Sequence, residues 1–259
     1  MALIWGDLMS FRPPAYIQAA IGSRGLWGVG WHFHRIEDGH GPVNMDRYTV
    51  DISQMPLASS VTPFPPFDPA RRATPSELVY YIRTKLNMFV DSQLAGFEPY
   101  DIVPDAAAWA TPVPLLAVIH IDMRDPRGAL PPSSNPDDGS VCVTAATDEW
   151  WQFSTLFTPL DGGHPVSGNR RFGIEAGIAE GSYVFFARGA DRPTGIIDQI
   201  VQSQVWESSH ALWLSYQARI ATFINQNGGQ AQAGYAIAER HDWDAYEVQS
   251  QYHPTEAWI

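Results

Sequence analysis

Thr158–Gly173, with the sequence TPLDGGHPVSGNRRFG, is the segment around which we expect the chain to fold. A strand-like run follows it, and then a second motif, Ala187–Arg192, reads ARGADR. Together the two motifs carry a histidine, a hydroxyl, an amide and four arginines on glycine-rich turns between apolar segments. Scaffolds commonly present binding and catalytic groups on such turns. The two motifs therefore predict a functional site, although neither matches a known catalytic signature.

Composition predicts a folded globular protein. The 259 residues are 45% hydrophobic and 17% charged, enough apolar material for one α+β domain spanning residues 1–259. The net charge of −12 and the pI of about 4.9 disfavour nucleic acid and anionic membranes as partners. Cationic or neutral partners fit this charge better, and a protein partner is compatible with it.

Two features bear on location. Cys142 is the only cysteine, so no internal disulfide can form, and its valine neighbours place it in the core. No window contains the roughly 18 apolar residues of a membrane span, and the first residues lack the basic and apolar regions of a Sec-type signal. The sequence predicts a protein without a membrane span that is cytoplasmic, or exported without a Sec-type signal.

Alternating hydrophobicity predicts several strands. Bulky residues alternate with glycine and histidine over Trp27–Phe33, and Arg47–Ile52 also alternates, so we expect these two segments to pair as antiparallel strands. Apolar runs predict four further strands, at Leu115–Ile121, Val141–Ala145, Trp150–Phe157 and Ser182–Ala187. We expect His120 to lie in the core beside the first of these runs.

Helix signals complete the predicted fold. Thr74-Pro75-Ser76-Glu77 is a capping box with proline at the first helical position, and helical spacing continues to about Asp91. A second helical pattern covers Ile196–Val205, and a third starts near Ser208 and ends at Asn227-Gly228-Gly229. We predict an α+β fold, a mostly antiparallel sheet with about three main helices.

The arginines of the two motifs suggest anion binding. If both motifs flank neighbouring strands, their planar guanidinium groups can converge on a carboxylate or phosphate. A histidine there can serve as general acid or base, with Asp161 or Asp191 fixing its tautomer and a hydroxyl or amide orienting the ligand. The predicted catalytic residues are His164, Ser167 and Asp191, and the predicted ligand-binding residues are Asn169, Arg170, Arg188 and Arg192.

Two alternatives compete with this site. The arginines can instead pair with nearby acids and only lock loops, because acidic residues outnumber basic ones. Separately, His32 and His34 lie two positions apart on a predicted strand and face the same way, so that with His40 or Glu37 they could hold Zn²⁺. Apart from that zinc we expect no cofactor, because the sequence has no P-loop, dinucleotide fingerprint or H-E-x-x-H motif.

The motifs resemble those of a family of uncharacterised bacterial proteins loosely associated with secretion and polymorphic-toxin systems. The resemblance rests on Phe153-Ser154-Thr155, Thr158-Pro159, His164–Arg170, Phe172-Gly173 and Arg188–Arg192. It implies a bacterial secretion-associated protein, an effector with hydrolase-like activity on a small anionic or cell-envelope ligand, and it brings no assigned catalytic residues. The alternatives are a non-catalytic binding or scaffold protein and a metal-dependent enzyme on the histidine strand.

Overall fold

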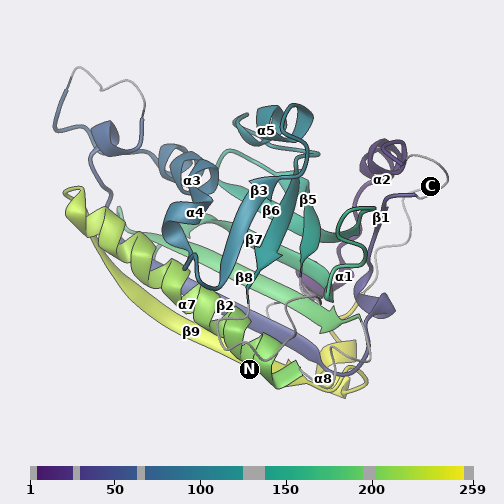
Figure 1. The fold of residues 1–259 in the computed structure, drawn as a ribbon. Helices are drawn as coiled ribbons and strands as arrows, with labels where there is room; N and C mark the ends of the chain where they lie inside the picture. Colours follow the sequence, from purple (N-terminus) through teal and green to yellow (C-terminus); the bar gives the residue numbers. More distant parts are fainter. Residues whose placement is uncertain (1–4, 26–29, 63–67, 125–137, 195–201, 254–259) are drawn as a thin grey trace.

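The computed structural model describes residues 5–25, 30–62, 68–124, 138–194 and 202–253 (Figure 1). Its helices are α1 (Gly6–Ser10), α2 (Ala15–Gly22), η1 (Ile36–Asp38), η2 (Ala58–Ser60), α3 (Pro75–Thr84), α4 (Leu86–Phe89), α5 (Pro104–Trp109), α7 (Gln202–Gln226) and α8 (Tyr246–Gln249). Its strands are β1 (His32–Phe33), β2 (Val43–Gln54), β3 (Ala95–Pro99), β4 (Val118–Met123), β5 (Gly139–Ala146), β6 (Trp150–Phe157), β7 (Val166–Ala176), β8 (Tyr183–Pro193) and β9 (Gln230–His241).

The strands form one sheet in the order β3-β4-β5-β6-β7-β8-β2-β9. The short strand β1 lies off this path and pairs with β6. Every pairing between the described strands is antiparallel. Among the described helices, α2, α3 and α7 have eight residues or more. The predicted α+β fold with a mostly antiparallel sheet is confirmed.

The sheet has two differently covered faces. We call the face under α7 the inner face and the opposite one the outer face (Figure 1). In β2, Tyr48, Val50 and Ile52 belong to the large inner core with α3, α4 and α7. Val43 and Met45, one position out of phase, pack instead with α1, η1 and α8 on the outer face. The period-two alternation of a strand therefore decides which face each residue of the predicted site reaches.

Several predicted elements differ from the structure. Segment Trp27–Phe33 contributes only β1, which pairs with β6 and not with β2, while residues 26–29 lie outside the described residues. The expected pairing with Arg47–Ile52 is wrong because β8 and β9 flank β2 on both sides. His120 is not a core residue; its side chain lies at the outer face beside Asp161, 23% exposed. Cys142 is fully buried, as predicted, and burial raises its pKa.

The C-terminal third forms one helix and one strand. Two helices were expected, but α7 is continuous through Ser208, and residues 195–201 lie outside the described residues. Its predicted glycine terminus is confirmed, because Gly228 has a φ of 78° and the Gly229 N–H donates to the Ile224 carbonyl at 2.9 Å. The following strand β9 was missed, since an edge strand rich in alanine and glutamine lacks the usual apolar alternation.

The capping box of α3 is confirmed. The Glu77 N–H donates to Thr74 Oγ1 at 3.2 Å, and the Thr74 N–H donates to Glu77 Oε2 at 2.8 Å. The helix ends at Thr84, earlier than predicted, and α4 follows after Lys85 leaves helical geometry with φ −116° and ψ 30°. The box fixes the start of a helix whose apolar side lies in the inner core.

Removing this cap should measurably destabilise the protein. Thr74→Ala deletes the oxygen that accepts the Glu77 N–H, and such losses cost about 1 kcal/mol. Chemical denaturation followed by circular dichroism measures the change. Thr222→Ala is the matched control, because Thr222 lies inside α7, where alanine is the better helix former. Equal losses in both variants would contradict a capping role for Thr74.

Candidate functional site

The predicted site residues lie on both faces of the sheet. The second half of the Thr158–Gly173 segment is not a turn but part of the central strand β7, paired with β8. Register places Ser167 opposite Arg192 and Gly168 opposite Asp191. Because neighbouring strand residues point to opposite faces, Ser167 and Arg192 face outward while Asp191 faces inward. The expected convergence of these groups at one place is therefore wrong.

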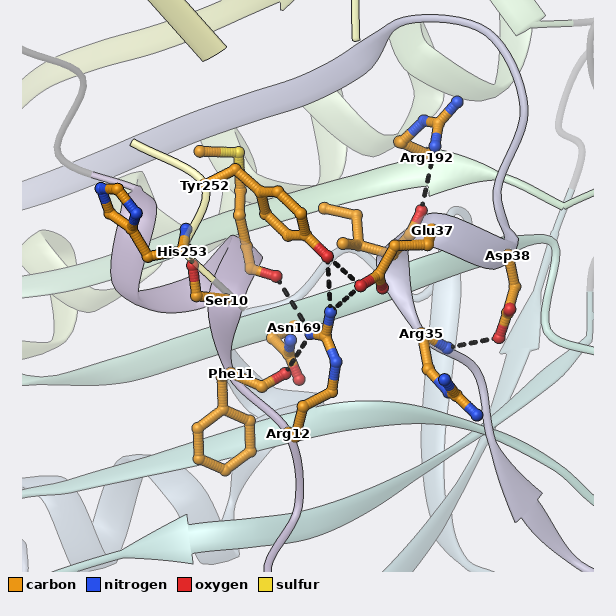
Figure 2. Close-up of polar contacts among 12 residues, drawn as sticks. Ser10, Phe11, Arg12, Arg35, Glu37, Asp38, Asn169, Arg192, Tyr252 and His253 are labelled. Atoms are coloured by element: carbon orange, nitrogen blue, oxygen red, sulfur yellow. Dashed lines mark hydrogen bonds and ion pairs between the residues drawn. The ribbon is translucent and has the colours of Figure 1, made fainter. Parts of the chain in front are cut away.

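Three of the predicted residues hold other segments on the outer face. Ser167 Oγ donates to the Arg192 carbonyl at 3.2 Å, and Asn169 Nδ2 donates to the Leu8 carbonyl at 2.8 Å. Arg192 donates to the Gly41 carbonyl at 3.1 Å. It also donates to the Ile36 carbonyl at 3.3 Å, the contact of Arg192 that Figure 2 draws. These contacts match the alternative in which the polar groups of the motifs lock neighbouring segments.

Two arginines of the motifs do come together, on the outer face. Arg171 Nη1 and Arg188 Nη2 lie 3.0 and 2.6 Å from the same oxygen, Asp7 Oδ2 on α1. Arg47 is the next cross-strand neighbour of Arg188 and pairs with Glu175 at 2.6 Å. Each of these guanidinium groups is thus matched with a carboxylate.

His164 is buried and held as a neutral imidazole. Its Nδ1 lies 2.9 Å from the Val166 carbonyl oxygen, and its ring packs where a side chain on Gly139 would lie. Burial, reinforced by His34, lowers the pKa of His164 to about 3. At neutral pH the ring is therefore uncharged and only 5% exposed, which does not suit a general acid facing solvent.

The histidine strand gives no group of metal ligands. His32 and His34 lie with ring centroids 5.7 Å apart, and His32 stacks on Phe157 at 4.8 Å. His40 lies in the turn before β2, where its N–H donates to the Pro193 carbonyl. Within the described ranges, no three histidine, cysteine or acidic side chains are arranged to hold a metal ion.

A polar cluster lies on the inner face beneath the first half of α7, where an apolar core would be expected. We call it the inner-face cluster. Asn44 pairs with both Asp191 and Arg240 and lies four residues before Tyr48 on β2, so the alternation of the strand places these side chains on one face. Its members are Asn44, Asp46 and Tyr48 of β2, Arg170 of β7, Asp191 of β8, His210 of α7 and Arg240 of β9.

The centre of the cluster is a bidentate ion pair. Arg170 Nη1 and Nη2 lie 2.7 and 2.6 Å from the two carboxylate oxygens of Asp46, which is 3% exposed. The Arg170 guanidinium also lies 4.4 Å from the ring centroid of Trp213 on α7. Burial alone would lower the pKa of Arg170, but Asp46 outweighs it and raises this pKa. Gly189 makes the space, because a Cβ there would lie 2.5 Å from Arg170 Nη2.

Asp191 is the one predicted catalytic residue in this cluster. Asn44 Nδ2 donates to Asp191 Oδ1 at 2.9 Å. Burial raises the pKa of Asp191 to about 6, with Asp46 adding to the rise and Arg170 and Arg240 opposing it. The carboxyl group therefore exchanges its proton close to neutral pH.

The cluster contains buried polar atoms that have no hydrogen-bond partner within the described part of the chain. These are Asn44 Oδ1 and two nitrogens of Arg240, Nε and Nη2. Nearby, Tyr48 Oη and His210 Nδ1 are hydrogen-bonded at 2.8 Å, and burial raises the Tyr48 pKa. An unpaired buried polar group costs about 1–3 kcal/mol, and such groups are usually satisfied by water or a ligand. The unpaired acceptor and donors mark the part of the cluster best suited to bind a small molecule.

Sequence reasoning found only part of this cluster. Asp191 and Arg170 were predicted, whereas Asn44, Asp46 and Arg240 were not. The signal was present in β2, because Asn44 and Asp46 have the same parity as Tyr48, which faces the core. Extending the predicted strand from Arg47 back to Val43 would have placed a polar pair on an apolar face. For Arg240 the signal was absent, because β9 itself was not recognised.

No protein-family model and no curated protein matches the chain. Among solved structures it is similar to the di-domain ARO/CYC StfQ from the steffimycin biosynthetic pathway, with 8% identity and a TM-score of 0.40 over 74% of this chain and 53% of that one. A norcoclaurine synthase point mutant from Thalictrum flavum gives 7% identity and a TM-score of 0.44 over 73% of this chain and 98% of that one.

A conserved protein from Geobacillus kaustophilus gives 12% identity and a TM-score of 0.35 over 73% of this chain and 99% of that one. This chain thus aligns with about half the length of StfQ and nearly all of the other two. Similarity at this level carries no activity or ligand over to this protein. In the parts of the chain that the structure describes, no helix is both long and apolar enough to cross a membrane.

Proposed function

We propose that this protein binds a small anion at the inner-face cluster, with Arg240 as its main contact and Asn44 as a polar neighbour. The observation that carries the proposal is the pair of buried Arg240 nitrogens, Nε and Nη2, that have no hydrogen-bond partner among the residues that the structure describes. A guanidinium offers planar donors that match carboxylate, sulfate or phosphate oxygens. Arg170 is not available for this role, because Asp46 occupies both of its Nη atoms.

The charge of the cluster supports an anion. Asp46 balances Arg170, which leaves Arg240 as the remaining positive charge when Asp191 is protonated. The Tyr48–His210 pair lies alongside, with Tyr48 Oη and His210 Nδ1 hydrogen-bonded at 2.8 Å. In a protein of net charge −12, this makes the cluster a local site for negative charge.

The proposed affinity for anions should depend on pH. The pKa of Asp191 is raised to about 6 by burial, so below that pH the carboxyl is neutral and above it carries a charge that competes with the ligand for Arg240. Sulfate, which keeps its charge from pH 5 to 8, should bind about tenfold more tightly at pH 5 than at pH 7.5, a difference of about 1.4 kcal/mol. Calorimetric titration at constant ionic strength measures this.

Variants separate the site from the general surface. Arg240→Gln should lower sulfate affinity at least about tenfold, as expected for loss of a charged hydrogen bond. Arg219→Gln, which removes a half-exposed arginine of α7, is the matched control and should leave affinity unchanged. Asp191→Asn should remove the pH dependence while keeping the tight binding. Equal sulfate affinity in wild-type protein and Arg240→Gln would exclude this site.

As a second function we propose hydrolase-like activity at this cluster in a bacterial secretion-associated effector. The observation that favours it is Asp191, whose pKa of about 6 suits a general acid or base at neutral pH. Inducible expression in a bacterial host tests it: growth inhibition should be lost in Asp191→Asn, provided that the variant remains folded. Growth unaffected by the wild-type protein, in both the cytoplasm and the periplasm, would leave anion binding as the proposed function.

A further inference from the structure

A separate cavity of about 360 Å³ lies at the β3 edge of the sheet. It is formed where the α3–α4 junction and the end of α5 meet the inner side of β3 and β4 (Figure 1). Phe97 and Ile119 are buried residues of its wall, and Trp109 is partly buried beside them. Its volume is at the lower end of the range for small-molecule sites, which are mostly apolar with a few placed polar groups.

Hydrogen bonds fix the walls of this cavity. The side-chain amide of Asn87 both donates to and accepts from the Phe97 backbone at 2.9 Å, so α4 is fastened to β3. Arg83, 1% exposed, donates to the carbonyls of Trp109 and Thr111 and thereby fastens the end of α5 to α3. The cavity is therefore already formed, and a ligand need not pay to order its walls.

The mouth of the cavity carries the only lysine of the sequence, Lys85. Lys85 and Glu98 are both exposed lining residues. Within the described part of the chain, no carboxylate forms an ion pair with Lys85. An apolar wall with one ammonium at the mouth complements a molecule that has an apolar body and one carboxylate. Glu98 disfavours a second carboxylate because like charges repel.

We propose that this cavity is a binding site for small monocarboxylates with an aromatic or aliphatic body. Lys85 holds the carboxylate, and Phe97, Trp109 and Ile119 contact the apolar body. The site lies apart from the inner-face cluster and uses none of its residues, so it goes beyond the anion binding proposed above.

The test uses the single lysine as a reporter. Reductive methylation with ¹³C-formaldehyde labels only Lys85 and the terminal amine, and NMR then follows the Lys85 signal while 3-phenylpropionate is added. We expect saturable binding with a dissociation constant of order 1 mM, as for a ligand of this size. The uncharged analogue 3-phenylpropanamide should bind at least about fivefold more weakly, since it lacks the charge. Phenylsuccinate, with two carboxylates, should also bind more weakly than 3-phenylpropionate.

Variants test whether Lys85 holds the carboxylate. Each unlabelled variant is titrated with 3-phenylpropionate and its binding is measured by calorimetry. Lys85→Gln should weaken 3-phenylpropionate binding at least about fivefold and leave the amide unaffected. Arg219→Gln should leave 3-phenylpropionate binding unchanged, which separates this site from surface charge. Met88→Glu, which adds a negative charge to an exposed lining residue, should weaken binding without disturbing the core. Absence of a saturable Lys85 shift, or wild-type affinity in Lys85→Gln, would overturn the proposal.

Discussion

Arg170→Met should lower the free energy of unfolding by about 3–5 kcal/mol, the usual cost of leaving one partner of a buried ion pair unpaired. The Asp46 carboxylate, 3% exposed, would then lose the two guanidinium hydrogen bonds of 2.6 and 2.7 Å. Methionine retains much of the side-chain volume beside Trp213. The loss of stability should therefore come mainly from the broken ion pair and not from an empty cavity. Urea denaturation at pH 7.5 followed by tryptophan fluorescence measures the change.

A double variant identifies the cause. In Asp46→Asn/Arg170→Met no buried charge is left without its partner, so a large part of the lost stability should return. Arg219→Met removes a half-exposed arginine, 3.9 Å from Asp91, and should cost less than about 0.5 kcal/mol. A loss below about 1 kcal/mol in Arg170→Met would show that water reaches the pair and that the cluster is open to solvent.

Asp191→Asn should stabilise the protein at neutral pH. Burial raises the pKa of Asp191 from 3.8 to about 6, so the folded state binds this proton more tightly than the unfolded state does. The contribution to stability is fully present below about pH 4 and is lost as the pH rises through about 6. A shift of about two units corresponds to about 2–3 kcal/mol, which the uncharged amide should recover at pH 7.5.

The pH profile of the stability gain shows whether the gain comes from ionisation of Asp191 or from a cause that does not depend on pH. The gain in Asp191→Asn should be greatest near pH 7.5 and should shrink steadily toward pH 4, because wild-type Asp191 is then protonated as well. Denaturation curves at several pH values in this range measure the gain in the free energy of unfolding. Asp148→Asn, at an exposed residue between β5 and β6, is the control and should show no gain that changes with pH. A gain that does not change with pH would mean that ionisation of Asp191 is not its cause. The ionised carboxylate would then not be the source of the predicted loss of anion affinity.

The sequence predicted best those elements whose signals are local. The capping box at Thr74 and the apolar strand Trp150–Phe157 depend on neighbouring residues and are present as expected. The segment around Ser167 was interpreted as turns because it is polar and glycine-rich. In the structure Gly168 and Gly173 give room between neighbouring strands, as Gly189 does for the Arg170 side chain. The requirement for glycine at these positions arises from tertiary contacts, so no local sequence pattern predicts it.

The candidate site was predictable only in part for the same reason. Asp191 and Arg170 stand in recognisable motifs, but their partners Asn44, Asp46 and Arg240 come from strands more than 45 residues away. Charge pairing across the sheet depends on strand order, and β2 is placed between β8 and β9 only by the fold. The alternative in which the arginines pair with acids fits Arg170, which pairs with Asp46 on the inner face. Arg192 instead donates to the backbone carbonyls of Gly41 and Ile36.

The contacts drawn in Figure 2 bear on the order in which parts of the protein can pack during synthesis. Arg12 Nη2 donates to Tyr252 Oη at 2.8 Å, and the His253 N–H donates to Ser10 Oγ at 2.8 Å. The segment around Ser10 and Arg12 is thus fastened by residues some 240 positions later in the chain. Until that later segment has left the ribosome, Trp5 and Met9 lack the Val248 side of their cluster. Nascent chains should therefore need chaperone protection of Trp5 and Met9 until the segment around Val248 has emerged.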